Sequence, residues 1–138
     1  MSTKKPAAAV DVRVRLTMLW VFVLFNMAYA DILSLMDPTS AIRLRMTGTP
    51  ITPGFLLVGA VLMETVIAMV VLCWVLPYMA NRWANIVVAA ANILAVVTGG
   101  HGLYYTFFAT IEVVCMLLIV WFAWTWKPVS EPNTGGQQ

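Results

Sequence analysis

Four stretches of apolar residues dominate the chain, and each is about as long as a helix that crosses a bilayer. They run from about Leu16 to Met36, from about Gly54 to Leu76, from about Trp83 to Gly99 and from about Tyr104 to Trp126. A helix of roughly 20 residues, rising about 1.5 Å per residue, spans the roughly 30 Å hydrocarbon layer of a membrane. The pattern therefore predicts an all-α integral membrane protein with the architecture of a four-helix bundle.

Helix-ending residues separate these stretches. The breaks lie at Asp37-Pro38, at Pro50 and Pro53, at Pro77, at the run Gly99-Gly100-His101-Gly102 and at Lys127-Pro128. Proline and glycine are the strongest local signals for the end of a helix. Outside the bundle, residues 16–126, we expect residues 1–15 to form a cytoplasmic basic arm and residues 127–138 to form a disordered cytoplasmic tail.

The composition excludes several classes of protein. Of 138 residues, 62% are hydrophobic and 10% are charged, against about 45–50% and about 25% in soluble domains. A net charge of +2 is too small to indicate nucleic-acid binding. Cys73 and Cys115 form no CxxC pair, and the chain has no nucleophile, metalloprotease or phosphate-loop motif. The sequence therefore assigns no cofactor and favours a protein that is not an enzyme.

The distribution of basic residues predicts the orientation of the bundle. One side carries Lys4, Lys5, Arg13, Arg15, Arg82 and Lys127, whereas the other carries only Arg43 and Arg45. Loops rich in lysine and arginine stay in the cytoplasm. Both termini are therefore predicted to be cytoplasmic, in a bacterial inner membrane. Trp20 and other aromatic residues near the span ends are interpreted as interfacial anchors.

The first span has an alternative interpretation as a signal peptide. It follows a basic region and contains Ala28-Tyr29-Ala30, which matches an A-x-A cleavage site. The apolar run, however, continues beyond this site to Met36. This continuation favours an uncleaved first span.

A weak internal repeat suggests two tandem helical hairpins. Glu64 and Glu112 lie at similar positions in the second and fourth spans. Parallel repeats of this kind occur in transporters. Coincidence between apolar helices is the alternative explanation.

Acidic residues inside the predicted spans are the candidate functional residues. Asp31, Glu64 and Glu112 each lie within a span, where an ionised acid costs about 2.5–3.5 kcal/mol on insertion scales. A protonated acid could instead donate a hydrogen bond to Asn26 or Asn92. Together these five residues form the candidate buried polar cluster.

Two other arrangements would also offset the cost of the buried acids. Arg43 and Arg45 could fold toward Asp31 from the outer loop, and His101 could add to a small outer cluster. Alternatively, the acids could bind a metal ion, a proton chain or a polar head group. If the acids only join helices through hydrogen bonds, no ligand is required.

Two stripes of small and polar residues are expected to face the bundle interior. The first is Ala60, Glu64 and Ala68, and the second is Asn85, Ala89, Asn92, Val96 and Gly99. Small residues allow close helix approach, and amides bond across helices. Glu64 and Asn92 lie at similar depth, so we expect that they can meet.

Several short motifs resemble a known family. They are Tyr29-Ala30-Asp31, Met63-Glu64, the run from Asn81 to Ile86 (NRWANI), the run from Tyr105 to Glu112 (YTFFATIE) and the run from Trp121 to Trp126 (WFAWTW). Together they resemble an uncharacterised bacterial family of small four-span membrane proteins, a domain of unknown function that is loosely similar to DoxX-like proteins. The resemblance implies a four-helix inner-membrane protein with an uncleaved first span, and it implies no established activity.

Three functions are compatible with these features. The first is a non-enzymatic membrane subunit or accessory protein, whose partner is another membrane protein or a second copy. The second is a small proton- or cation-coupled carrier that uses Glu64 and Glu112. The third is a DoxX-like, quinone-linked redox component. The sequence favours the first, because it requires the fewest special residues.

Overall fold

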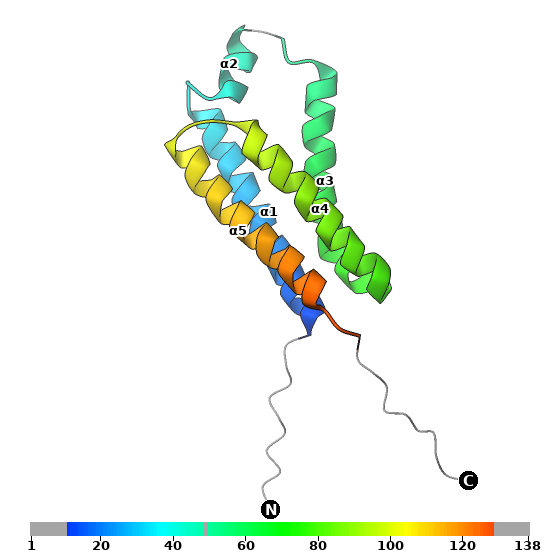
Figure 1. The fold of residues 1–138 in the computed structure, drawn as a ribbon. Coiled ribbons are helices and arrows are strands. Elements are labelled where there is room, and N and C mark those ends of the chain that lie inside the picture. Colours follow the sequence, from blue (N-terminus) through cyan, green and yellow to red (C-terminus); the bar gives the residue numbers. More distant parts are fainter. Residues whose placement is uncertain (1–10, 49, 129–138) are drawn as a thin grey trace, which may run out of the picture.

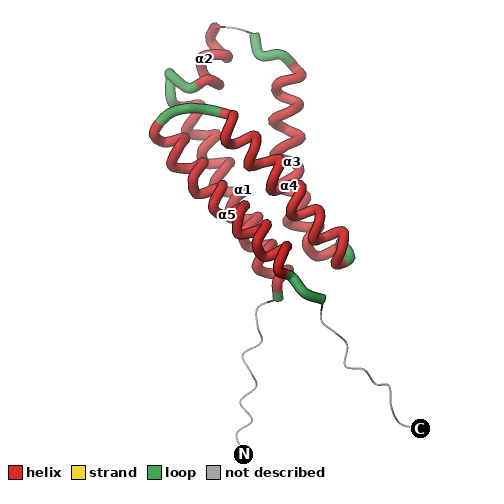
Figure 2. The backbone as a smooth tube through the Cα atoms, in the orientation of Figure 1, coloured by secondary structure: helices red, strands yellow, loops and turns green. Residues whose placement is uncertain are grey.

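The computed structural model describes residues 11–48 and 50–128, and this part of the chain is helical (Figures 1 and 2). The helices are α1 (Val12–Met36), α2 (Ala41–Gly48), α3 (Pro53–Val75), α4 (Tyr78–Gly99) and α5 (Leu103–Thr125). All except α2 are long and apolar enough to cross a membrane, with 25, 23, 22 and 23 residues. At about 1.5 Å per residue they measure about 33–38 Å. The prediction of an all-α, multi-pass membrane protein is therefore confirmed.

The four long helices alternate in direction, and each lies beside two others. α1 packs against α3 and α5, and α4 packs against α5 and less extensively against α3. We call the end that holds Asp11, the α3–α4 turn and Trp126 the terminal end. The opposite end, with α2 and the α4–α5 turn, is the loop end (Figure 1). The first and last described residues therefore lie on the same side of the bundle.

The helix boundaries follow from local chemistry. Thr52 caps α3 by accepting a hydrogen bond from the Phe55 N–H, and proline occupies the first turn, where its missing N–H costs little. Asp37 and Leu76 each precede a proline and are extended, because the proline ring disfavours the helical conformation of the residue before it. Gly102 has φ +131°, which suits glycine in the turn before α5.

Two helices are longer than the hydropathy pattern predicts. α1 begins at Val12 rather than Leu16, and α4 begins at Tyr78 rather than Trp83. The added turns carry arginine and asparagine, which lower hydropathy but are compatible with a helix at the membrane edge. Helix α2 lies in a loop where no helix was predicted. The predicted disordered tail lies outside the described residues, apart from Lys127 and Pro128.

Core packing is concentrated in the terminal half of the bundle. Leu16, Trp20 and Val23 of α1 are fully buried there, beside Cys73 of α3 and Met116 of α5. In contrast, residues 53–61 of α3 are all exposed. Figure 1 shows the loop half of α3 standing apart from its neighbours. The bundle is thus closed at one end and open at the other.

Candidate functional site: a chamber at the loop end

A chain of buried hydrogen bonds fixes the closed end of the bundle. Trp20 Nε1 donates to Asn85 Oδ1 at 2.7 Å, and Asn85 Nδ2 donates to Asn81 Oδ1 at 2.7 Å. Asn81 Nδ2 in turn donates to the Cys73 carbonyl at 2.7 Å. All four side chains are completely buried. Because this network joins α1, α3 and α4 and pairs its amide groups, it holds the helices together and needs no ligand.

The interpretation of Trp20 as an interfacial anchor is therefore wrong. Its ring has no exposed surface, and its indole N–H bonds inside the protein. Leu16, Trp20 and Val23 are spaced at i, i+4 and i+7, which is typical of one buried helix face. This spacing is the sequence signal that would have predicted a buried Trp20. At this end, arginine side chains instead lie over the rings of two other tryptophans, of which Trp124 is exposed and Trp126 is half-buried. Arg82 lies 5.1 Å from the Trp124 ring centroid and Arg13 lies 5.7 Å from that of Trp126.

The open end of the bundle encloses a chamber of about 540 Å³. All five helices contribute to its wall. Its polar lining residues are Asp31, Ser34, Ser40, Asn92, His101, Tyr104, Tyr105 and Glu112. The wall formed by α3 is apolar and includes Phe55, Gly59 and Met63. Pockets that hold small molecules typically measure about 300–1,000 Å³, so the chamber is large enough for one.

Glu112 is the buried acid of the chamber. Its side chain is only 4% exposed, and Oε1 accepts a hydrogen bond from Asn26 Nδ2 at 3.2 Å. The same nitrogen also donates to the Phe108 carbonyl at 3.2 Å. Oε2 has no hydrogen bond to a described residue, and it keeps some accessible surface. Glu112 therefore presents an acceptor, or a donor when protonated, to the chamber.

Asn92 provides a second polar group with spare bonding capacity. Its Nδ2 donates to the Val88 carbonyl at 2.9 Å and to Thr65 Oγ1 at 3.2 Å. A carbonyl can only accept, so the nitrogen must face Val88. Oδ1 is enclosed by the protein and has no partner in the described part of the chain, and the residue as a whole is 1% exposed and borders the chamber. An unpaired buried amide oxygen is costly, so Asn92 is a destabilising polar group at the chamber wall.

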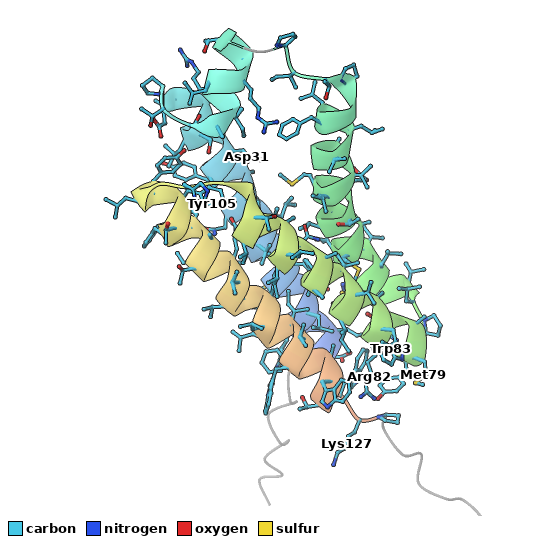
Figure 3. All side chains as sticks on the ribbon, turned by 45° about the horizontal axis from the view of Figure 1, so that its top comes forward. Asp31, Met79, Arg82, Trp83, Tyr105 and Lys127 are labelled. Carbon is cyan, nitrogen blue, oxygen red and sulfur yellow. The ribbon has the colours of Figure 1, made fainter. Side chains whose placement is uncertain are left out.

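Asp31 and the tyrosines form the rim of the chamber. Asp31 lies five residues after Asn26 on α1, which places it about 7.5 Å nearer the loop end, and it is exposed. Figure 3 shows Asp31 and Tyr105 at this end, far from Arg82 and Lys127. Tyr104 Oη donates to Ser34 Oγ at 3.3 Å, and Tyr105 Oη donates to the Val96 carbonyl at 2.6 Å.

The two outer arginines do not fold toward Asp31 as expected. Arg43 donates to the Leu35 carbonyl at 2.7 Å, at the end of α1. Arg45 lies over the Phe55 ring, 4.7 Å from its centroid, and so joins α2 to the first turn of α3. Of the lining residues that the structure describes, none is lysine or arginine. The acids therefore face a chamber whose described lining holds one histidine, His101, and no lysine or arginine.

Glu64 lies outside the chamber. It is exposed on α3, whose buried residues are Val66, Met69 and Cys73. The expectation that the Ala60–Glu64–Ala68 stripe faces the interior is therefore wrong at Glu64, although Ala60 lines the chamber. Asn92 meets Thr65 instead of Glu64. The α4 stripe does face inward at Asn85, Ala89, Asn92 and Val96, although Gly99 is exposed.

His101 lines the chamber from the α4–α5 turn and is exposed. Within residues 11–48 and 50–128, no three His, Cys, Asp or Glu side chains lie close enough together to hold a metal ion. Cys73 and Cys115 are both free and buried. The chamber therefore offers carboxyl, amide and hydroxyl groups for binding rather than a metal centre.

Comparison with known proteins gives one result. No curated protein and no solved structure matches the chain significantly. The model of one family, described as "Family of unknown function (DUF6326)", matches residues 9–131. This match includes every helix that the structure describes, together with Asn26, Asp31, Asn92 and Glu112. The chain therefore belongs to the family of unknown function DUF6326.

Proposed function

We propose that this chain is a non-enzymatic membrane protein that binds an amphiphilic organic cation in the loop-end chamber. The observation that carries the proposal is Glu112, a buried carboxyl group on the wall of a cavity whose described lining contains no lysine or arginine. A cationic head group would supply a positively charged partner for Glu112 and Asp31.

The other lining residues suit the rest of such a ligand. Phe55, Tyr104, Tyr105 and Phe108 all border the chamber. Aromatic faces attract organic cations within about 6 Å of the ring. The apolar wall of α3 would cover the ligand's hydrocarbon part. Acids at one side and apolar residues at the other match an amphiphile better than a hydrated inorganic ion.

Access from the bilayer follows from the position of α3. Residues 53–61 of α3 are exposed, and this half of the helix stands apart from α4 (Figure 1). A molecule dissolved in the membrane could therefore reach the chamber sideways, without crossing water. With both termini in the cytoplasm of a bacterial cell, the chamber would open to the outer leaflet of the inner membrane. Arg13, Arg15, Arg82 and Lys127 at the terminal end support this orientation.

The alternative functions make different demands on the same residues. A carrier that uses both Glu64 and Glu112 would need both acids on one pathway, whereas only Glu112 lines the chamber. A quinone-linked component would place a neutral ring beside Glu112 and Asn92. A neutral ligand would use the amide and hydroxyl groups but would gain little from two acids.

Equilibrium binding of radiolabelled tetraphenylphosphonium to the full chain in lipid nanodiscs tests the cation directly. We expect saturable binding, weakened at least tenfold by Glu112→Gln and by Asp31→Asn. Glu64→Gln is the matched control, because it makes the same change outside the chamber, and it should bind normally. Equal competition by neutral triphenylphosphine oxide, or unchanged binding in Glu112→Gln, would contradict the proposal. Preferential retention of a quinone would instead support the redox alternative.

A further inference from the structure

A second feature of the molecule, independent of the chamber, is the outward face of α3. Leu57, Glu64 and Val71 are spaced by seven residues, which places them nearly on one line along the helix. Leu57 and Val71 are 63% and 61% exposed, and Glu64 is exposed between them. The line is flanked by Val61, Ile67, Trp74 and Val75, all of them exposed. We call this set of residues the α3 seam.

Glu64 is the polar residue of the seam, and its own chain gives it no partner among the described residues. Three threonines on the exposed helix surfaces are satisfied locally. Thr98, Thr106 and Thr110 each donate to a carbonyl of the preceding turn. In contrast, the Glu64 carboxyl lies near the middle of α3 and makes no hydrogen bond to a described residue. Acids in spans face protein or a water-filled cavity, so a protein surface is expected to cover this position.

We infer that the α3 seam is the interface with a second copy of this chain, arranged in parallel around a two-fold axis that passes beside Glu64. Copies of one chain insert with the same orientation, so their α3 helices run parallel in the membrane. In a parallel pair with seven-residue spacing, each seam residue meets the same residue of the partner. The two Glu64 carboxyls then lie at the same depth.

This arrangement satisfies Glu64 without any other polar residue. Two carboxyl groups that each carry a proton can each donate one hydrogen bond to the other and accept one in return. A single polar residue at such a position also fixes the register of two helices. Apolar seam residues alone would not drive association, because lipid tails are as apolar as leucine and valine. Glu64 therefore supplies the specific attraction, and the flanking residues supply the packing.

Cysteine cross-linking in native membranes tests the seam. Val71→Cys and Leu57→Cys should each give a disulfide-linked dimer on mild oxidation, because each residue faces its own copy across the axis. Leu117→Cys, which is equally exposed but lies on α5, is the matched control and should remain a monomer. Cross-linking of Val71→Cys to a different protein, or no cross-linking at either seam position, would overturn the inference.

Two substitutions of Glu64 separate its hydrogen bonding from its packing. Glu64→Gln keeps a donor and an acceptor, so the dimer should persist in detergent and in nanodiscs. Glu64→Leu removes both and should weaken the dimer at least tenfold, while the monomer stays folded because leucine is compatible with lipid. A dimer unaffected by Glu64→Leu would contradict the role of the carboxyl. Tetraphenylphosphonium binding in both variants should match that of the unaltered chain, which keeps this test separate from the chamber.

Discussion

Asn26 on α1 donates a hydrogen bond from Nδ2 to Oε1 of Glu112 on α5, at a distance of 3.2 Å. The pair joins two neighbouring helices at the wall of the chamber and positions the one buried acid of the site. Because Asn26 Nδ2 also bonds to the Phe108 carbonyl, its orientation is fixed from α5 as well. Asn26 thus holds Glu112 with one oxygen bonded to protein and the other available.

Replacing Asn26 with alanine removes this support. We expect Asn26→Ala to lower the free energy of unfolding by about 1–3 kcal/mol, the usual cost of leaving a buried polar group without its partner. Thr98→Ala is the control, since its hydroxyl bonds to its own helix on an exposed surface, and it should change stability by less than about 0.5 kcal/mol. Thermal unfolding in the same detergent compares the two, and equal stability of both variants would argue against a structural role for Asn26.

Filling the chamber from its apolar wall should block binding without disturbing the fold. A Cβ atom added at Gly59 would meet no atom within 4 Å, and Gly59 lines the chamber. Gly59→Leu should therefore reduce tetraphenylphosphonium binding at least tenfold while the unfolding temperature stays the same or rises, since leucine favours helices more than glycine. Gly54→Leu is the matched control on the same helix, because Gly54 is equally unobstructed but lies outside the chamber. If both variants bind normally, the ligand does not occupy this cavity.

The closed end should respond to mutation in stability rather than in binding. Trp20→Phe removes the indole N–H that pairs with Asn85 Oδ1, so we expect a loss of about 1–3 kcal/mol of unfolding free energy. Trp121→Phe, at an exposed position on α5, should be nearly neutral. Ligand binding should persist in folded Trp20→Phe. If the Trp20→Phe variant is fully folded but no longer binds the ligand, the terminal end and the loop end of the bundle are coupled.

One acid outside the spans has a pH dependence that can be predicted. The side-chain hydroxyl and the backbone N–H of Thr39 both donate to the Asp37 carboxylate, and they hold its pKa below the ordinary value. A lowered pKa stabilises the fold above the ordinary pKa of aspartate, and that contribution is lost as the pH falls through the lowered value. Thr39→Ala should therefore raise the pKa of Asp37. Carbon-13 NMR titration of the Asp37 carboxyl measures this shift, and an unchanged or lower pKa would show that Thr39 does not stabilise the charged form.

The four long helices could be predicted from sequence because hydrophobic length alone decides whether a helix can span a bilayer, whereas the short, polar α2 could not. The inward face of α4 was also predictable, since Asn85, Ala89 and Asn92 mark one stripe on an otherwise apolar helix. The same approach failed for α3, whose residues are apolar on every side apart from Glu64 and Thr65. Such a helix carries no pattern that separates a buried face from one that contacts lipid.

The failed symmetry between Glu64 and Glu112 shows what sequence position alone leaves undetermined. Both acids lie near the middle of their spans, yet one is exposed and the other is 4% exposed. The difference arises because Glu64 lies on the outward face of α3, opposite the buried Val66, Met69 and Cys73, whereas Glu112 lies on the inward face of α5. Which face of a helix turns inward depends on contacts between distant segments, such as the network of Trp20, Asn81 and Asn85. Those contacts leave no local pattern in the sequence.

The most direct measurement of the chamber's role is photoaffinity labelling with an azide-bearing triphenylphosphonium probe, followed by peptide mapping of the labelled residues. The proposed function predicts labels on chamber residues of α1, α3 and α5, competed by excess tetraphenylphosphonium and lost in Gly59→Leu. Labelling confined to the outward faces of α4 and α5, or undiminished by the competitor, would contradict a specific cation site at Glu112.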